Sequence, residues 1–278
     1  MSGTRTVPLT LCNFRDLGGI VCADGQSLPS GLLFRSEAPA PQAQGDIERL
    51  RRLGVRTFVD LRSPEETSSS APPDRAEPGS YVSAALRRVD WEDRDVPPDG
   101  MAGFLAERYL QLAEEGLGGD RPVGRALTAL LDPSRTGRIV WCAGGKDRTG
   151  IVVAVLLHLL GASHEAIAAD YACSAEASAE LRRRARRDAA TGAAPTRNRD
   201  PAERRRMLRA SAAAFPGGVG ALANPAPPEA ITLFLTQLDR RHDGIQRYAE
   251  RAGLDAEAIP KVRQTLFSVS GAYPSSTA

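Results

Sequence analysis

The chain has 278 residues, 42% of them hydrophobic, and a formal net charge of +2. This length holds one large domain with insertions or one domain with a cap, and the apolar content is ample for a core. The longest apolar run, around residues 151–160, is too short to span a membrane, and the N-terminus lacks the apolar segment of a secretion signal. We therefore expect a cytoplasmic protein, with export by a signal-less route as the alternative. Four cysteines do not indicate a disulfide framework, and we expect Cys12, Cys22 and Cys173 to be buried thiols.

Predicted strands alternate with predicted helices up to residue 142. In chain order we expect strands and turns over 14–36, a helix over 46–53, a strand over 55–61, a loop over 63–80, a short strand near 81–86, helices over 101–115 and 121–131, and a strand over 138–142. A long apolar helix follows from Ile151. This alternation predicts an α/β fold with a central, mostly parallel sheet flanked by helices.

The C-terminal half is predicted to be helical, with an arginine-rich segment in its middle. Residues 182–209 hold eleven arginines against three acidic residues, a balance of +8, so the remainder of the chain carries −6. We expect a single domain over 1–278, with 176–228 as a basic helical lid or insertion. A solvated helical face is the simpler interpretation; the alternative is a surface that attracts a phosphorylated substrate or an anionic membrane. The segment lacks aromatic residues to stack on bases, which argues against nucleic-acid binding.

The segment Cys142-Ala-Gly-Gly-Lys-Asp-Arg-Thr-Gly150 carries the strongest functional signal. A predicted strand enters it, two glycines turn it and an apolar helix leaves it, which is the geometry that binds phosphate with backbone N–H groups. A thiol at the mouth of such a loop can attack the bound phosphorus. The other cysteines have Gly18, Leu28 and Ala179 six positions on, so only Cys142 has an arginine there. A buried cysteine in a strand-to-helix turn is the alternative.

This segment resembles the signature of the bacterial family of protein-tyrosine and phosphoinositide phosphatases that keeps Lys-Asp inside its phosphate loop. Three further segments resemble motifs of the same family in the same order: 13–19 (Asn-Phe-Arg-Asp-Leu-Gly-Gly), 31–36 (Gly-Leu-Leu-Phe-Arg-Ser) and 60–66 (Asp-Leu-Arg-Ser-Pro-Glu-Glu). The resemblance implies a tyrosine-phosphatase-like fold and metal-independent phosphomonoester hydrolysis through a phosphocysteine intermediate, without a cofactor. It also implies dual specificity, for phosphotyrosyl proteins or phosphoinositides.

The residue types suggest a division of roles within the loop. Cys142 is the expected nucleophile, and Arg148 is expected to bind two phosphate oxygens through its planar fork. Thr149 stands where the resembling family places a hydroxyl that assists departure of the sulfur. The complete expected phosphate-binding set is Ala143, Gly144, Gly145, Lys146, Arg148, Thr149 and Gly150.

Two sources compete for the general acid. Asp147 lies beside the nucleophile in the loop, and in the resembling family an aspartate there is the favoured acid. The acidic, proline-rich stretch 90–99 is the other candidate, although such runs are commonly surface loops. Lys146 would add a second cation for a substrate with more than one phosphate, or be an ordinary solvated lysine.

A second polar group ends the predicted strand at 55–61. Asp60 and Arg62 are secondary site candidates because functional residues collect at the C-terminal ends of parallel strands. Arg62 could instead form an ion pair with Glu66 that holds a loop, and Arg35 receives the same structural interpretation.

One residue departs from the family pattern and keeps other functions open. Trp141 occupies the position before the nucleophile, where the family usually has His, so a weak or inactive phosphate-binding protein is an alternative. A small phosphorylated metabolite, such as a nucleoside 5′-monophosphate, is a further substrate alternative, and a sulfurtransferase is a further class. A nucleotide-binding P-loop is excluded because Lys146 is followed by Asp147. By their sequence spacing, the histidines at 158, 164 and 242 form no metal-like cluster.

Overall fold

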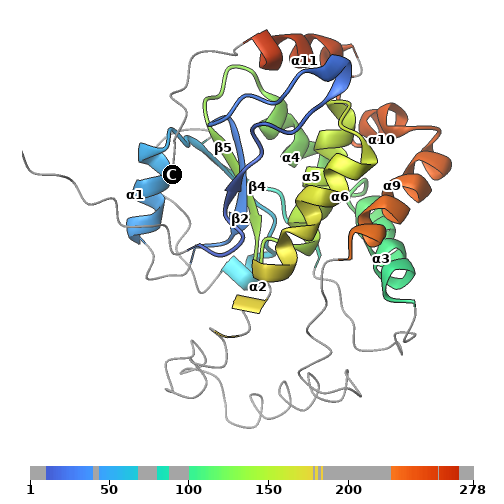
Figure 1. Ribbon diagram of the computed structural model, residues 1–278, viewed down its shortest axis with the longest axis horizontal. Helices are drawn as coiled ribbons and strands as arrows, with labels where there is room; N and C mark the ends of the chain where they lie inside the picture. Colours follow the sequence, from blue (N-terminus) through green and yellow to red (C-terminus); the bar gives the residue numbers. More distant parts are fainter. Residues whose placement is uncertain are drawn as a thin grey trace, which may run out of the picture.

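The computed structural model describes residues 11–39, 44–67, 80–87, 100–177, 179–180, 183, 227–255 and 257–268. Five strands form one sheet in the order β1-β2-β5-β3-β4 (Figure 1). The strands are β1 (Arg15–Asp16), β2 (Leu33–Glu37), β3 (Thr57–Asp60), β4 (Tyr81–Ser83) and β5 (Arg138–Cys142). Only β1 runs antiparallel to its neighbour, so the predicted α/β class with a mostly parallel sheet is confirmed.

The register of the sheet brings the strand ends that matter to one edge. Cys142, the last residue of β5, pairs with Glu37 at the end of β2, while Asp60 at the end of β3 pairs with Trp141. Because these strands are parallel, their C-terminal ends open on the same side of the molecule, where sites form in open α/β sheets. The loop after β5 is therefore flanked by the residues that follow β2 and β3.

Helices cover both faces of the sheet. The helix α1 (Gln44–Arg52) covers one face, where Leu50 packs with Phe58, Ile139 and Trp141 (Figure 1). The other face packs against the larger core, which contains α3 (Met101–Glu115), α4 (Pro122–Leu131) and α5 (Asp147–Leu159). Further helices complete this side: α6 (His164–Ala172), α9 (Pro228–His242), α10 (Ile245–Arg251) and α11 (Ala258–Ser268).

The helix α5, which follows the loop after β5, is almost entirely buried. Eleven of its thirteen residues are buried, so it is enclosed on all sides rather than amphipathic. Its apolar run packs against the sheet and against α3, α4, α6 and α9. Since a helix that is apolar all round must be buried, this packing fixes the position of the helix N-terminus at the loop.

Several boundaries and two assignments differ from the sequence-based expectations. Helix α1 spans 44–52 rather than 46–53 and β3 spans 57–60 rather than 55–61, shifts typical of element ends. The stretch after Arg62, expected to be loop, begins with one helical turn, α2 (Pro64–Thr67). Cys12 and Cys22 are buried as expected, but Cys173 is exposed, so that expectation was wrong.

Two expected features lie largely or wholly beyond the described residues. The acidic stretch 90–99 lies wholly outside the described residues, and the expected basic lid over 176–228 is described only at its two ends and at 183. Both therefore remain predictions. None of the helices in the described ranges is long and apolar enough to cross a membrane.

Candidate active site

The loop from Cys142 to Arg148 joins the end of β5 to the start of α5. Cys142 is 3% exposed, and α5 begins at Asp147. Gly145 adopts a positive φ of 66°, and a Cβ there would lie 2.3 Å from the backbone oxygen of Ser36. Glycine is thus required at this position both by backbone conformation and by the approach of β2.

Two side chains from the N-terminal region hold the carbonyls of this loop. Asn13 Nδ2 donates to the oxygen of Gly145 at 2.7 Å and to that of Gly144 at 3.3 Å, and Arg35 Nη2 donates to Gly145 at 2.8 Å. In a planar trans peptide the N–H points opposite to the C=O, so the N–H groups of Gly145 and Lys146 point away from these donors. The loop thus presents N–H groups as an anion site does.

Of these two side chains, Arg35 is anchored directly to α6, and Asn13 is linked to α6 through Arg15, which donates to it. Arg35 is fully buried, and its Nη1 contacts Asp170 Oδ2 at 2.5 Å, while Arg15 Nε contacts Asp170 Oδ1 at 2.6 Å. Burial alone would raise the pKa of the Asp170 carboxyl, but the two guanidinium groups hold it below its usual range. Burial lowers the pKa of Arg35, and Asp170 opposes that shift. The charged group Arg15–Asp170–Arg35 therefore links α6 to the loop.

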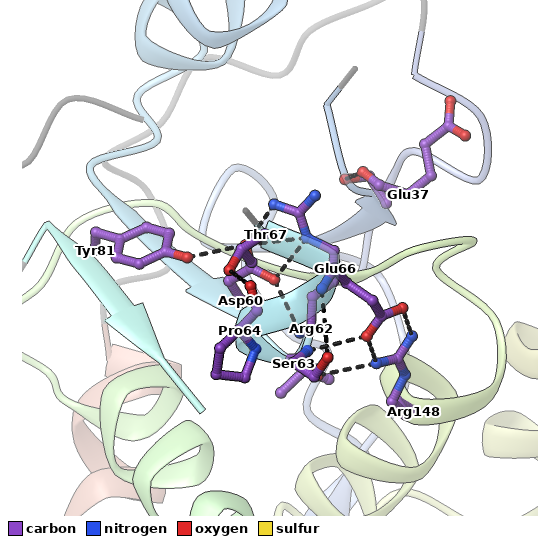
Figure 2. A network of polar contacts seen from close by, with 11 residues as sticks. Glu37, Asp60, Arg62, Ser63, Pro64, Glu66, Thr67, Tyr81 and Arg148 are labelled. Atoms are coloured by element: carbon purple, nitrogen blue, oxygen red, sulfur yellow. Dashed lines mark hydrogen bonds and ion pairs between the residues drawn. The ribbon is translucent and has the colours of Figure 1, made fainter. Parts of the chain in front are cut away.

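Arg148 is oriented by a carboxylate from the loop after β3. Its Nη1 and Nη2 donate to the two carboxylate oxygens of Glu66 at 2.5 and 2.7 Å (Figure 2). Nη1 also donates to the carbonyl of Leu61 at 3.3 Å. Burial would lower the pKa of Arg148, but Glu66 and the nearby Cys142 raise it above its ordinary value. Guanidinium has five N–H donors, and within the described ranges nothing bonds the edge formed by Nε and the second N–H of Nη2, which could hold a bidentate ligand.

A capping box places Glu66. The N–H of Ser63 donates to Glu66 Oε2 at 2.9 Å, and the N–H of Glu66 donates to Ser63 Oγ at 3.4 Å (Figure 2). Pro64 occupies the first helical position between them, where its missing N–H costs nothing. The local sequence Ser63-Pro-Glu-Glu66 thus sets the direction from which Arg148 is held.

The secondary candidates Asp60 and Arg62 form a separate pair beside the site. Arg62 Nη2 donates to Asp60 Oδ2 at 2.7 Å, and the hydroxyl of Tyr81 donates to the same oxygen at 3.0 Å (Figure 2). The main partner of Arg62 is therefore Asp60 rather than the expected Glu66, although Glu66 still contributes an attraction. Asp60 is fully buried, so the pair stabilises the end of β3 and the turn that carries Glu66.

Asp147 lies at the end of a buried chain of hydroxyl groups. Tyr109 donates its hydroxyl hydrogen to Asp147 Oδ1 at 2.5 Å, and the hydroxyl oxygens of Tyr109 and Tyr171 are 2.6 Å apart. When Asp147 is ionised its carboxylate only accepts, and the order of donation is then Tyr171 to Tyr109 to Asp147. Burial and the charge of Asp147 raise the pKa of Tyr109 well above its ordinary value, so it stays a donor. Lys146 Nζ lies 3.5 Å from the same carboxylate oxygen.

Thr149 lies at the start of α5 next to the loop, whereas Trp141 lies in the core on the α1 side of the sheet. Thr149 is buried on the first turn of α5, and its Oγ1 has no hydrogen-bond partner among the described residues. Trp141 packs against Phe58, with ring centroids 5.7 Å apart, in the core on the α1 side. Side chains alternate along a strand, so Trp141 and Cys142 project to opposite faces of the sheet. The indole therefore fills a core position and leaves the thiol side of the loop unobstructed.

Comparison with known proteins agrees with this geometry. The sequence profile of the tyrosine phosphatase family matches residues 8–268. The chain belongs to this family. A Cupriavidus necator protein, provisionally named a tyrosine-protein phosphatase, is 34% identical over 231 residues, which cover 77% of this chain and 80% of the relative. The triple specificity protein phosphatase PtpB of Mycobacterium tuberculosis is 30% identical over 62% of this chain and 70% of its own length. A tyrosine-protein phosphatase of Nostoc commune is 28% identical over 54% and 50%.

Family membership confirms the predicted resemblance and the phosphatase activity that it implied. A phosphatase acts on a phosphorylated substrate, and the loop after β5 is the place in this fold where the sequence predicted that substrate. Sequence reasoning missed Tyr109, Tyr171 and Asp170, which contact the loop or its supports. No local pattern marks Tyr109 as a site residue, because the carboxylate that accepts from its hydroxyl lies 38 positions away in the sequence.

Proposed function

We propose that the protein is a cysteine-dependent phosphatase in which Cys142 is the nucleophile and forms a phosphocysteine intermediate. The observation that carries this proposal is the orientation of Arg148 on the first turn of α5: Glu66 holds Nη1 and Nη2, and no described residue bonds the Nε/Nη2 edge. That edge and the loop N–H groups supply the donors that a phosphoryl group needs as its charge redistributes. Every group in the proposed mechanism is a side chain or a backbone N–H group of this chain.

In the first half-reaction the Cys142 thiolate attacks phosphorus in line with the leaving oxygen. The S–P bond forms, the bond from phosphorus to the leaving oxygen breaks, and Asp147 transfers its proton to that oxygen. In the second half-reaction water attacks phosphorus, Asp147 accepts a proton from it, and the S–P bond breaks to release thiolate and inorganic phosphate. Thr149 Oγ1, buried without a partner in the described part of the chain, would donate to the departing sulfur.

Asp147 is the acid that the geometry supports. The carboxylate that forms when it gives up its proton already has a donor in Tyr109 at 2.5 Å, so the product of proton transfer is stabilised in place. The competing acidic stretch 90–99 lies outside the described residues. Comparing aryl phosphates with good and poor leaving groups would separate the two, because only the acid's loss affects poor leaving groups selectively.

For the substrate we favour a phosphotyrosyl protein or a phosphoinositide. One relative is named for triple specificity, and Lys146 adds a cation beside the loop, 13% exposed in its side chain, that could contact a second phosphate. A small metabolite such as a nucleoside 5′-monophosphate is the alternative. If Lys146 contacts a second phosphate, Lys146→Ala will reduce turnover of polyphosphorylated headgroups more than turnover of a phosphotyrosyl peptide.

The placement of Trp141 favours an active enzyme over a phosphate-binding protein without activity. The indole lies in the α1-side core, so it blocks neither Arg148 nor Thr149. The test is phosphate release from a panel of aryl phosphate, phosphotyrosyl peptide, phosphoinositides and nucleoside monophosphates in the presence of EDTA. We expect turnover that Cys142→Ser abolishes while phosphate binding persists. Unchanged turnover by Cys142→Ser would rule the mechanism out, and phosphate binding without turnover would favour the inactive alternative.

A further inference from the structure

Three helices bring two histidines and a carboxylate together at a distance from the loop. His158 lies in the last turn of α5, His164 is the first residue of α6, and Asp239 lies near the end of α9. Each offers one ligand atom, and these atoms lie within 4.8 Å of one another. No local sequence pattern marks this group, because Asp239 is far from both histidines along the chain. The expectation that the histidines form no metal-like cluster therefore misses what the fold brings together.

The contacts inside this group are close but incomplete. His158 Nε2 lies 2.9 Å from Asp239 Oδ2, and the two imidazole rings lie edge to face with centroids 4.9 Å apart. The second oxygen, Asp239 Oδ1, is buried and has no hydrogen-bond partner among the described residues. A buried carboxylate oxygen without a partner is costly, and the same carboxylate lies within 4.8 Å of both imidazoles, which points to a ligand shared by the three side chains rather than to a finished hydrogen-bond pair.

The donor set fits a zinc ion. Imidazole nitrogen and carboxylate oxygen bind Zn²⁺ at about 2.0–2.2 Å in tetrahedral sites, which places neighbouring ligand atoms about 3.3–3.5 Å apart. The observed separations of up to 4.8 Å reach that range with side-chain adjustments of about 1 Å. All three residues are partly exposed, so the ion can enter and a water molecule can complete the coordination.

We propose that His158, His164 and Asp239 form a zinc site that ties α5 to α6 and α9. His158 is eleven residues beyond Asp147 on the same helix, so the site lies about 16 Å from the start of α5 and takes no part in the chemistry there. These three helices pack against one another, and α6 also carries Asp170, which anchors the support of the loop (Figure 1). Zinc would stabilise this assembly, since a ligand that binds only the folded state adds to its stability.

The test measures zinc binding in a Cys142→Ser background, because thiolates also bind zinc. Calorimetry with Zn²⁺ gives the affinity and stoichiometry of binding. The visible spectrum of bound Co²⁺ reports a low coordination number, and the melting temperature with and without Zn²⁺ reports how far the ion stabilises the fold. His164→Asn and Asp239→Asn each remove one ligand. Asp243→Asn is the matched control, because it makes the same change one turn further on, where Asn also accepts the positive φ of 58°.

We expect the background variant to bind a single zinc ion and to melt at a higher temperature with it. Both ligand variants should bind more than about tenfold more weakly and lose the Co²⁺ spectrum, while Asp243→Asn keeps both. Zinc binding that is absent, or equally tight in His164→Asn, would overturn the proposal. If Asp239→Asn folds poorly, the zinc affinity of His164→Asn still tests the proposal, because His164 is partly exposed. None of these outcomes bears on phosphatase activity, so the two proposals fail separately.

Discussion

Glu66→Gln tests whether the carboxylate that holds Arg148 matters for turnover. Both oxygens of Glu66 bind a guanidinium that is 7% exposed, and glutamine keeps the size but offers one acceptor and no charge. Arg148 retains the carbonyl of Leu61, so we expect the loss of about one charged hydrogen bond, about 1.5–3 kcal/mol. If that energy is realised in the transition state, kcat falls about 10- to 150-fold.

Glu66→Gln has two effects on turnover, and measuring kcat and KM separately distinguishes them. Removing a negative charge near the phosphate site weakens repulsion of the anionic substrate, which would lower KM. Losing the orientation of Arg148 acts on the transition state and lowers kcat. We therefore expect a fall in kcat without a rise in KM, measured with an aryl phosphate. Glu65→Gln is the matched control, since Glu65 is exposed on the same turn. Unchanged kcat in a Glu66→Gln variant that melts normally would refute the reasoning.

Four further predictions follow from the same geometry. Asp147→Asn should slow turnover of poor leaving groups by about 10²–10⁴-fold and of good ones far less, whereas equal losses would move the acid elsewhere. Tyr109→Phe leaves the Tyr171 hydroxyl without its partner and should lower the free energy of unfolding by about 1–3 kcal/mol in denaturant titrations; no change would contradict the hydroxyl chain. Gly145→Ala should weaken phosphate binding and lower the melting temperature, because its Cβ meets the backbone of β2; a variant with normal binding would show that the loop tolerates another conformation. The pKa of Asp170 is lowered in the folded state, so its stabilising contribution is present above its unfolded pKa of about 3.9 and is lost as the pH falls through the folded pKa. Acid titration of stability should show this loss in the parent, and a parent stability that stays flat through that range would contradict it.

The sequence predicted the fold and the loop well because both depend on local pattern. The strand at 138–142, the glycines and the apolar helix from 151 are adjacent in sequence, and their spacing already implies a phosphate-binding turn. The one-turn helix after Arg62 was missed because a loop assignment ignored the capping box formed by Ser63 and Glu66.

The supports of the site could not be predicted, because they depend on long-range packing. Asp170 reaches Arg35 across 135 positions, and Tyr109 reaches Asp147 across 38. The sequence allowed an ion pair between Arg62 and Glu66, but in the structure Arg62 pairs with Asp60 and Glu66 with Arg148, since sequence proximity cannot show that Glu66 turns toward α5. Trp141 illustrates the same limit: its face of the sheet follows from strand alternation, but its core partner Phe58 follows only from sheet order.

The measurement that tests the central proposal most directly is rapid-quench trapping of the covalent intermediate. An aryl phosphate with a good leaving group is mixed with the parent protein and with Asp147→Asn, and the acid-quenched protein is analysed by intact mass and peptide mapping. We predict a burst of released aryl alcohol together with one phosphoryl group on Cys142, absent from Cys142→Ser. Steady turnover without a burst, and with no phosphoryl group on Cys142 in either protein, would contradict a phosphocysteine mechanism.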